Sequence, residues 1–397
     1  MPTAPPPPGR AEPALNGAIG ATVGAFALNR WLGNLFLRFP YVFVSDLSRA
    51  LGVGVAVTTP LLAVRELGGV VAPIGGRWVD RGHARFVLPA AGIVAGAACA
   101  GAPLLVGDGG RRSTGAIVWF TGLLLIGGAA KVVVDVGQNW WLGHRIEPNR
   151  RGRYVGLVEM TWSLAFLIGA PVVGWLGNAT RLGWRGGYWT VGAALVVAAI
   201  LSRRAGTTGR DRDDTGRSAP SARPPTVAPS LRRPHRFGRR YRVGLWVFFT
   251  VQPLAQMTVF AVNGDWFERQ VGLSTVEVGG VMALLGLAEL VGAAIALGCS
   301  DRLGALRLGR VGLAVCSLAL IGGVLAGTKA VPAIALMWLF DVALEMAFVS
   351  VLPVVTDLDP SRRGAAVSRV FVLMMASRAV GSAVAGSLYQ AGGFARR

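Results

Sequence analysis

The chain contains few of the residues that enzymes and metal sites use. Among 397 residues there are three cysteines and three histidines. The histidines all fall in basic stretches between apolar segments: His83, His144 and His235. None of them has the spacing of a metal site. We therefore expect no catalytic residues, no metal, no cofactor and no enzymatic activity.

Charge is also scarce, and acidic residues are scarcer than basic ones. Charged residues make up 15% of the chain and apolar residues 53%, with 40 Lys and Arg against 20 Asp and Glu. In a soluble protein, a net charge of +20 would suggest nucleic-acid binding. Here several uncharged stretches reach the length of about 20 residues that crosses a bilayer. The composition predicts a polytopic helical membrane protein in a lipid bilayer, without nucleic acid.

Eleven uncharged stretches are long enough to be membrane spans. They lie near 25–47, 52–75, 86–107, 114–138, 154–176, 187–202, 243–263, 273–299, 308–327, 331–355 and 366–388. With the amino terminus inside, most basic residues fall in interior segments, and only a few, such as Arg49 and Arg269, fall in outer loops. This bias sets the orientation by the positive-inside rule and explains the basic excess. We expect a cytoplasmic amino terminus.

Two loop motifs recur in the second half of the chain. DRGHAR begins at Asp80 after the second span, and DRLGALR begins at Asp301 after the eighth. PNRRG begins at Pro148 after the fourth span, and PSRRG begins at Pro360 after the tenth. Both pairs are separated by nearly the same length of chain. This predicts two six-helix halves arranged as a parallel repeat.

The repeat divides the chain into four parts. We expect a disordered cytoplasmic amino terminus over 1–24 and a six-helix bundle over 25–202. A cytoplasmic linker rich in Arg, Pro, Ser and Gly follows over 203–242, and a bundle of helices seven to eleven over 243–397. The second half ends before a counterpart of helix six, so the repeat predicts a truncated reading frame that lacks a twelfth helix.

The first loop motif resembles the signature of the major facilitator superfamily, G-x-x-x-D-R followed by basic residues between helices two and three. The matching residues of the two copies are Gly76, Asp80, Arg81, Arg85, Asp301, Arg302 and Gly304. His83 stands where the family has a further glycine. The resemblance covers the whole chain and implies an all-α membrane protein with two six-helix halves related by a pseudo-twofold axis. It also implies secondary active transport by alternating access.

The same resemblance implies a conformational latch formed by these loop residues. An Asp at the end of helix two can accept hydrogen bonds from the free N–H groups of a neighbouring helix N-terminus. On this interpretation Asp80 holds the two halves together in the outward-facing state. The alternative is that Arg77 and Arg85 only anchor the topology at the lipid headgroups.

Charged residues inside the spans are candidates for proton coupling. Each costs roughly 2.5–3.5 kcal/mol at a helix centre unless it has a partner or faces the bundle interior. The candidates are Glu159, Glu289, Asp341, Glu345 and Arg378. Lys131 and Asp135 lie one helical turn apart and are expected to form a structural ion pair.

Two alternatives remain open for these candidates. Glu159 either pairs with Lys131 of another helix or loads and releases a proton. Asp341 and Glu345, one turn apart, repel each other unless one is protonated or Arg378 serves as their counter-ion. That arrangement would suit proton coupling, whereas a fixed bridge from Arg378 to Asp341 or Glu345 would only hold the helices together.

Polar and aromatic side chains on several spans are candidates for a central substrate cavity. Arg30, Asn34 and Arg38 lie at i, i+4 and i+8, on one face of helix one. The cavity candidates are Asn34, Arg38, Arg65, Glu66, Trp162, Gln252, Gln256 and Trp338. Trp and Gln suit a poorly discriminating pocket for amphipathic molecules, although aromatic residues on membrane helices also serve as packing or interface anchors.

One further motif bears on the direction of transport. Pro171 and Gly174 match an element of the family's proton-driven exporters, while Ala170 and Trp175 replace its flanking glycines. The alternative is a plain proline kink with close glycine packing.

The function expected from these residues is proton-coupled export of a small organic molecule by a monomer. The partners are the substrate, protons and the lipid bilayer, and the expected location is a bacterial plasma membrane. The alternatives are a transport-inactive scaffold or sensor with the same fold, or an importer of a sugar or another metabolite.

Overall fold

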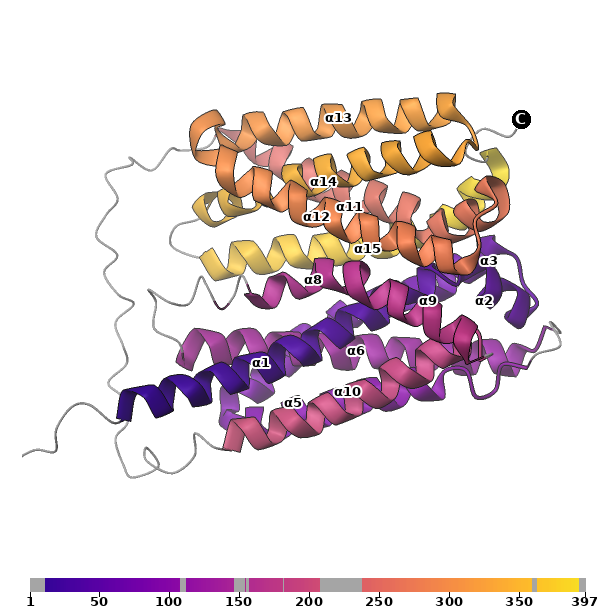
Figure 1. Ribbon diagram of the computed structural model, residues 1–397. Helices are drawn as coiled ribbons and strands as arrows, with labels where there is room; N and C mark the ends of the chain where they lie inside the picture. The colour runs from indigo at the N-terminus through magenta and orange to yellow at the C-terminus, as the bar shows by residue number, and fades with distance from the viewer. Residues whose placement is uncertain are drawn as a thin grey trace, which may run out of the picture.

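The computed structural model describes residues 11–107, 112–145, 154, 157–180, 182–207, 238–358 and 363–392. Within these ranges all regular structure is helical. The helices form two bundles, one from each half of the chain. Figure 1 shows the N-terminal bundle, coloured indigo to magenta, lying against the C-terminal bundle, coloured orange to yellow. The expected all-α fold with two halves is confirmed.

The N-terminal half runs from α1 to α10. Its elements are α1 Ala11–Arg38, η1 Phe39–Tyr41, α2 Val44–Leu51, α3 Val55–Ala63, η2 Val64–Val71, α4 Ala72–Trp78, η3 Val79–His83, α5 Ala84–Gly101, α6 Thr114–Arg145, α8 Thr161–Leu164, η4 Ala165–Gly169, α9 Ala170–Ala179 and α10 Trp184–Thr207. The C-terminal half has fewer and longer elements. They are α11 Arg239–Trp266, η5 Phe267–Val271, α12 Thr275–Leu303, α13 Ala305–Ala326, α14 Ala330–Leu358 and α15 Arg363–Gly392.

Ten helical stretches in the described part are long and apolar enough to cross a membrane. They coincide with ten of the eleven expected spans, and α1 overlaps the first part of the remaining one, 25–47. The stretch Val55–Trp78 passes through α3, η2 and α4. Pro60 lies inside α3 and removes a backbone hydrogen-bond donor there. The stretch Leu157–Gly177 contains a π-helical turn, η4, just before Pro171.

The ends of α1, α10 and α11 modify the expected domain boundaries. α1 begins at Ala11, so residues 11–24, for which the sequence predicts disorder, belong to a helix. The expected linker is helical at both ends, because α10 continues to Thr207 and α11 begins at Arg239. The middle of the linker lies outside the described residues.

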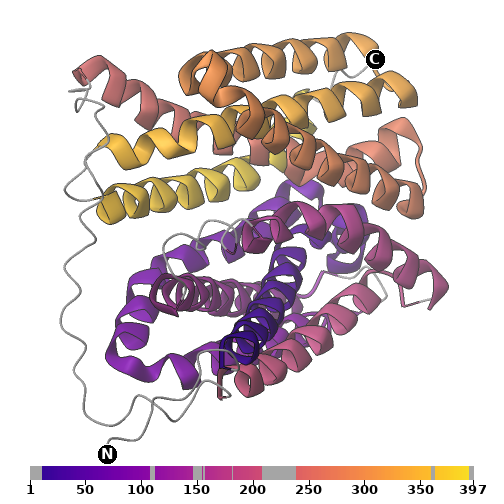
Figure 2. The same cartoon turned by 60° about the vertical axis from the view of Figure 1, so that its left-hand side comes forward.

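Within the N-terminal half, α1 lies among the other helices and contacts α10, α8, η4 and α6 (Figure 2). Its buried arginines therefore face protein. Glycine permits the closest approach between neighbours. A Cβ atom on Gly68 or on Gly128 would overlap the backbone of the facing helix, so η2 and α6 are in direct backbone contact.

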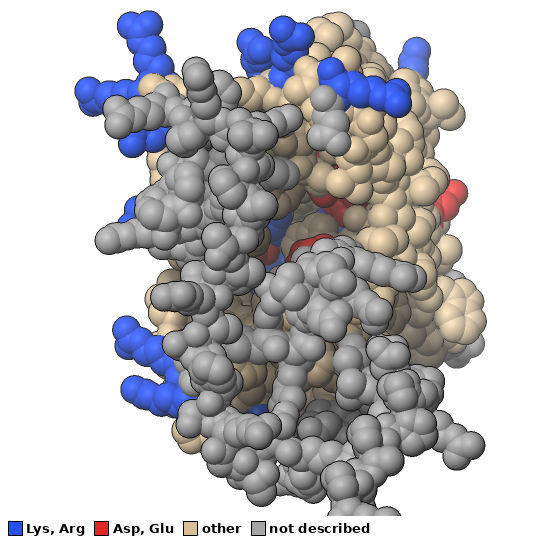
Figure 3. All heavy atoms as spheres, turned by 90° about the vertical axis from the view of Figure 1, so that its left-hand side faces the viewer, with Lys and Arg blue, Asp and Glu red and all other residues tan. Residues whose placement is uncertain are grey.

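The two halves meet along α3 with α15 and along α9 with α12. At the end of the molecule that carries α2, which we call the α2 end, the contact is tightest. A Cβ atom on Gly264 would overlap the Tyr41 carbonyl, and one on Gly386 would overlap the Val55 carbonyl. The opposite face is hollowed at its centre, and basic and acidic side chains are visible inside the hollow (Figure 3).

Candidate functional site

Two buried ion pairs join the N-terminal half to the C-terminal half. Arg38, the last residue of α1, donates from Nη1 to Glu289 Oε2 of α12 over 2.8 Å and from Nη2 to Glu289 Oε1. Arg378 of α15 lies 3.3 Å from Glu66 of η2, measured from Nε to Oε2. All four side chains are buried. The arrangement is reciprocal, because each half provides one arginine and one glutamate.

Trp162 of α8 lies between the two pairs. The guanidinium carbon of Arg38 is 4.5 Å from the centre of its ring, that of Arg378 is 5.0 Å away, and the Lys131 ammonium is 6.0 Å away. Arg38 Nη1 also donates to the Trp162 carbonyl over 2.9 Å. Cations over an indole face are stabilised by its quadrupole, most strongly where water is excluded. One aromatic ring thus links both inter-half pairs.

The predicted polar face of α1 lies along the start of the fifth span. Arg30 donates to Glu159 over 2.7 Å, and Asn34 donates to the Thr161 hydroxyl over 3.1 Å. Arg38 follows one turn later with its bond to Trp162. The spacing of these three residues therefore reflects a contact with one segment of chain, residues 159–162.

A third charged group lies wholly within the N-terminal half. Lys131 Nζ is 2.5 Å from Asp135 Oδ2, so the expected pair one turn apart is present. Arg30 Nη1 is 3.8 Å from Asp135 Oδ1. Of the two alternatives for Glu159, the pair with Lys131 is wrong, because Glu159 binds Arg30 instead. The Glu159 side chain is 56% exposed, which distinguishes it from the buried carboxylates.

Asp341 of α14 is a buried carboxylate without a hydrogen-bond partner. Its exposure is 0%, and neither oxygen has a donor in the described part of the chain. The charges that act on it are those of Glu289, Arg38 and Glu345. It therefore lies beside the Arg38–Glu289 pair.

The fixed bridge from Arg378 to Asp341 or Glu345, one of the two alternatives, is not formed. Arg378 faces the other half of the molecule, where it contacts Glu66 and also donates to Gln256 of α11 over 3.4 Å. The error has a geometrical cause, because α14 and α15 are neighbours but the arginine projects from the face of α15 that packs on η2.

The structure thus brings together most of the residues that the sequence indicated as cavity candidates. The members of the central cluster are Asn34, Arg38, Glu66, Trp162, Gln256, Glu289 and Arg378. Gln252 is buried one turn before Gln256 on α11. Trp338 lies on α14 and makes no described contact with the cluster, and Arg65 faces the ring of Tyr41 at 4.5 Å.

Phe166 and Phe260 belong to the same region but were not indicated by the sequence. Phe166 of η4 lies 3.7 Å below the Arg38 guanidinium and stacks on Phe260 of α11, with ring centres 5.9 Å apart. Apolar residues in an apolar span give no signal of their own. The only available sign was that Phe166 follows Trp162 by one helical turn.

A second polar contact closes the α2 end. Arg49 of α2 lies 3.1 Å from Glu268 of η5 and also binds Asp46. Ser45 donates to Asp265 of α11 over 2.7 Å. Burial opposes the charged form of Arg49, but Asp46 and Glu268 outweigh it and raise the arginine's pKa above its usual range. The contacts Arg49–Glu268 and Ser45–Asp265 thus join the two halves at this end, and we call them the inter-half gate.

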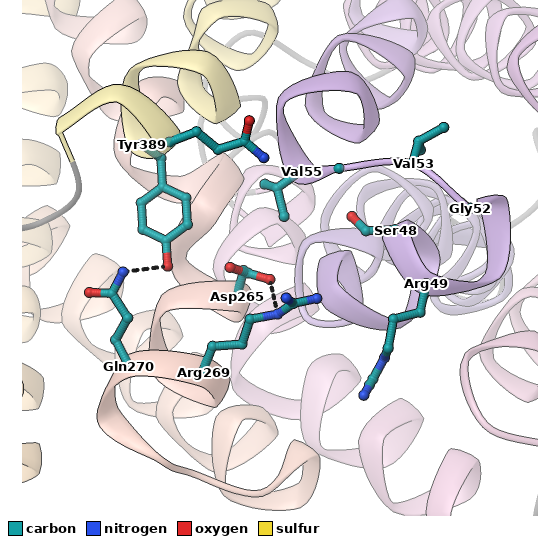
Figure 4. A pocket seen from close by; sticks show the side chains of 11 residues that line it. Ser48, Arg49, Gly52, Val53, Val55, Asp265, Arg269, Gln270 and Tyr389 are labelled. Carbon is teal, nitrogen blue, oxygen red and sulfur yellow. Dashed lines mark hydrogen bonds and ion pairs between the residues drawn. The ribbon is translucent and has the colours of Figure 1, made fainter. Parts of the chain in front are cut away.

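A pocket of about 520 Å³ lies beside this gate (Figure 4). Asp265 and Arg269 line it from α11 and η5, with 2.8 Å between Oδ1 and Nε. Gln270 donates to the Tyr389 hydroxyl over 3.0 Å. Its polar groups bind one another, so the pocket belongs to the closed gate.

The loop residues expected to form the latch are only partly described. Gly76 lies in α4, Asp80 and Arg81 lie in η3, and Arg85 lies in α5. Arg81 and Arg85 are exposed, and Arg85 contacts the Phe86 ring. The side chain of Asp80 lies outside the described residues, so the latch stays a prediction.

The second copy of the loop motif is described at only two of its three residues. Arg302 is exposed, and Gly304 has a φ of +86°, where it separates α12 from α13. The side chain of Asp301 lies outside the described residues. Pro171 lies in the first turn of α9, and a Cβ atom on Gly174 would come 3.7 Å from the Thr275 carbonyl of α12.

Comparison with known proteins identifies the fold. The family model of the Major Facilitator Superfamily matches residues 22–386. The uncharacterized MFS-type transporter YceJ of Bacillus subtilis (strain 168) is 23% identical over 259 residues, which cover 62% of this chain and 60% of that protein.

Solved structures of several transporters share the fold. One is a bacterial homolog of the human lysosomal transporter Spinster in an inward-facing and occupied conformation, with a TM-score of 0.71, 14% identity, and coverage of 93% of this chain and 82% of that one. The xylose transporter XylE from E. coli in a partially occluded inward-open conformation has a TM-score of 0.69, 14% identity and coverage of 94% and 92%. The chain is therefore a member of the major facilitator superfamily and a multi-pass membrane protein.

Proposed function

We propose that the protein is a proton-coupled exporter of a small organic molecule that works as a monomer by alternating access. The observation that carries this proposal is the reciprocal pair of buried bridges, Arg38–Glu289 and Glu66–Arg378, between the two halves. Alternating access requires the halves to tilt against each other about a central site. These bridges lie at that boundary, so their strength bears directly on the tilt.

Protonation offers a way to weaken the bridges. Removing one partner of a buried ion pair typically costs about 3–5 kcal/mol, because it leaves the other charge uncompensated. A proton on Glu289 would end its Coulomb attraction to Arg38 and allow the two helices to part. Asp341, buried beside this pair without a hydrogen-bond partner, is the group that we assign to pass the proton to or from Glu289.

The structure is closed at one end and open at the other, as alternating access requires. The halves are closed at the α2 end by the Arg49–Glu268 contact and hollowed at the opposite face (Figure 3). The hollowed face is the one at which α1 begins and α10 ends (Figure 1). Basic residues are concentrated near these helix ends, which by the positive-inside rule supports a cytoplasmic amino terminus in a plasma membrane. On this orientation the structure faces inward.

The side chains at the centre suit an amphipathic organic substrate. Trp162 offers an aromatic face, and Gln252 and Gln256 offer hydrogen bonds without net charge. Pro171 and Gly174 at the α9–α12 contact support export over import. Import is the second candidate, because a D-xylose-proton symporter shares the fold, with a TM-score of 0.68, 15% identity and coverage of 93% of this chain and 90% of that one.

The experiment is transport in proteoliposomes. Compounds that raise the unfolding temperature of the purified protein, chosen from drugs, sugars and amino acids, are assayed for flux with and without an imposed pH gradient. Export predicts accumulation driven by protons moving the opposite way, whereas import predicts movement in the same direction. Glu289→Gln should abolish proton-driven flux, and Glu277→Gln on the exposed start of α12 is the matched control. Absence of both ligand stabilisation and proton flux would favour a transport-inactive scaffold.

A further inference from the structure

Three carboxylates share two arginines at the α2 end. Asp46 of α2 binds Arg49 of the same helix, and Glu268 of η5 lies 3.1 Å from the same Nη2 atom of Arg49. Asp265 of α11 binds Arg269, with 2.8 Å between Oδ1 and Nε (Figure 4). Within these described contacts, the acidic groups outnumber the basic ones by one. One carboxylate of the cluster can therefore take up a proton while each arginine keeps a partner.

Glu268 is the carboxylate of this cluster whose charged form has the least support. Asp46 lies in the first turn of α2, where free N–H groups favour an anion. Asp265 accepts a hydrogen bond from the Ser45 hydroxyl in addition to its arginine. Glu268 lies in η5, the last turn of the helical stretch that begins with α11, and a helix dipole disfavours negative charge at that end. The charges of Asp46 and Asp265 also act on Glu268.

Solvent has access to the contact between Arg49 and Glu268. The Glu268 side chain is 19% exposed and that of Arg49 is 61% exposed, whereas the Asp265 side chain is only 4% exposed. The pocket beside the gate is lined by Arg49 and Arg269, so it brings solvent to the same place (Figure 4). On the orientation proposed above the α2 end faces the outside, and the inference rests on that part of the proposed function.

Loss of the Glu268 charge would part the two halves here at little cost. Arg49 keeps Asp46 as a partner on its own helix, and most of the arginine side chain is already in solvent. No buried charge is left unpaired, in contrast to the Arg38–Glu289 bridge at the centre. Exposed ion pairs shift an equilibrium only modestly. One proton is therefore enough to make or release this contact.

We propose that Glu268 is a proton-operated latch of the inter-half gate. When its carboxylate takes up a proton from the outer solution, its attraction to Arg49 is lost and the guanidinium stays with Asp46. The equilibrium then shifts toward states that are open at the α2 end.

The other elements packed around Glu268 carry further titratable or charged groups. These groups are Asp46 and Arg49 on α2, Asp265 on α11, Arg269 on η5, Glu277 at the start of α12 and Tyr389 on α15. Among the described ion pairs at this end, Arg49–Glu268 is the one that joins the two halves. Its loss therefore acts directly on the contact between them.

The test measures the separation of the halves at the α2 end by the distance between two spin labels on the purified full chain. Labels at Thr180→Cys, at the end of α9, and Lys329→Cys, before α14, are both exposed at that end (Figure 1). The background is Cys99→Ala/Cys299→Ala/Cys316→Ala. Titration from about pH 8 to about pH 4 passes through the usual pKa values of carboxylates. The ratio of open to closed protein should rise by up to about fivefold, as expected for loss of one exposed ion pair.

Three variants assign the response to its group. Glu268→Gln imitates the protonated latch, so it should be shifted toward the open state at about pH 8 and should lack this part of the pH response. Asp46→Asn leaves Arg49 to Glu268 alone, so the response should persist and move to lower pH. Glu277→Gln keeps a side chain that can complete the capping box of α12 and should behave as the wild type.

The difference between the wild type and Glu268→Gln is the decisive quantity, because Glu289 is also proposed to bind protons. If acid unfolds the chain, the comparison of these two proteins at about pH 8 decides the matter. A separation that does not change with pH in the wild type, or identical behaviour of Glu268→Gln and the wild type, would overturn the proposal.

The measurement requires neither a substrate nor a proton gradient, so it separates the latch from the proposed function. Opening on acidification without any proton-driven flux in proteoliposomes would support the latch and contradict proton-coupled transport. Proton-driven flux with a separation that ignores pH would support transport and contradict the latch.

Discussion

Arg38 and Glu289 bind each other through two hydrogen bonds across the boundary between the halves, although 251 positions separate them in the chain. The Arg38 guanidinium also lies over the rings of Trp162 and Phe166. These rings contact it in addition to the Glu289 carboxylate. A cation held in this way has little freedom to find another partner. Whatever changes the charge of Glu289 therefore changes the contact between α1 and α12.

The energetics of this bridge can be separated from its role in transport. We expect Arg38→Met to destabilise the protein by about 3–5 kcal/mol, because Glu289 would remain buried and unpaired. The double variant Arg38→Met/Glu289→Met should recover most of that loss, since two apolar side chains of similar size can pack in place of the pair. Thermal unfolding of the wild type, Arg38→Met, Glu289→Met and the double variant checks this. Additive destabilisation in the double variant would show that the two residues do not form a unit.

Proton-driven flux should be lost in both the single and the double variant. The pair would then serve transport rather than stability. Substantial proton-driven flux in the double variant would show that coupling takes place at another group.

Replacement of Asp341 should stabilise the protein, in contrast to replacement of Arg38. Asp341→Asn removes a buried carboxylate that has no hydrogen-bond partner, so we expect a higher unfolding temperature at neutral pH. If Asp341 passes protons, the same variant should transport with a flattened pH dependence. The measurement is flux over a series of pH values in proteoliposomes. A pH profile identical to that of the wild type would exclude Asp341 from the proton path.

A disulfide across the gate should stop the transport cycle. Ser45 Oγ and Asp265 Oδ1 are 2.7 Å apart on opposite halves. We expect Ser45→Cys/Asp265→Cys to form a disulfide that holds the α2 end closed, with transport lost on oxidation and recovered on reduction. Each single cysteine variant is the control and should respond to neither treatment. Full transport by the oxidised, crosslinked protein would show that this end does not open.

Two glycines of α12 provide a matched pair for the contact between the halves. A Cβ atom on Gly286 would overlap the Leu167 nitrogen of η4, whereas one on Gly280 would meet nothing within 4 Å. We expect Gly286→Ala to destabilise the protein by about 1–3 kcal/mol through overpacking. Gly280→Ala should stabilise it by up to about 1 kcal/mol through helix propensity. Unfolding temperatures of the two variants check this, and equal shifts would contradict the close contact.

The fold was accessible from the sequence because its signals are local. Uncharged stretches of suitable length indicated the spans, and the repeated loop motifs indicated two halves. The i, i+4, i+8 spacing on α1 likewise indicated that Arg30, Asn34 and Arg38 share an interior face. Helical periodicity fixes which residues of one helix point together, and the structure agrees with it.

The partners of the buried charged residues could not be predicted from the sequence, because they depend on how distant helices face one another. The sequence offered only the carboxylates of the preceding helix as partners for Arg378, yet Arg378 binds Glu66 of the other half. The gate was missed for another reason. Arg49 and Glu268 lie outside the spans expected from the sequence, where a charge has no cost that would mark it as paired.

The reciprocity of the two central bridges has an electrical consequence. Each half places one positive and one negative side chain at the boundary, namely Arg38 with Glu66 and Arg378 with Glu289. When a half tilts, its two opposite charges move together, so this layer carries almost no gating charge through the membrane field. In the proposed transport cycle, the membrane potential, worth about 2.3 kcal/mol per elementary charge at 100 mV, would then act on the proton and the cargo and hardly at all on these bridges.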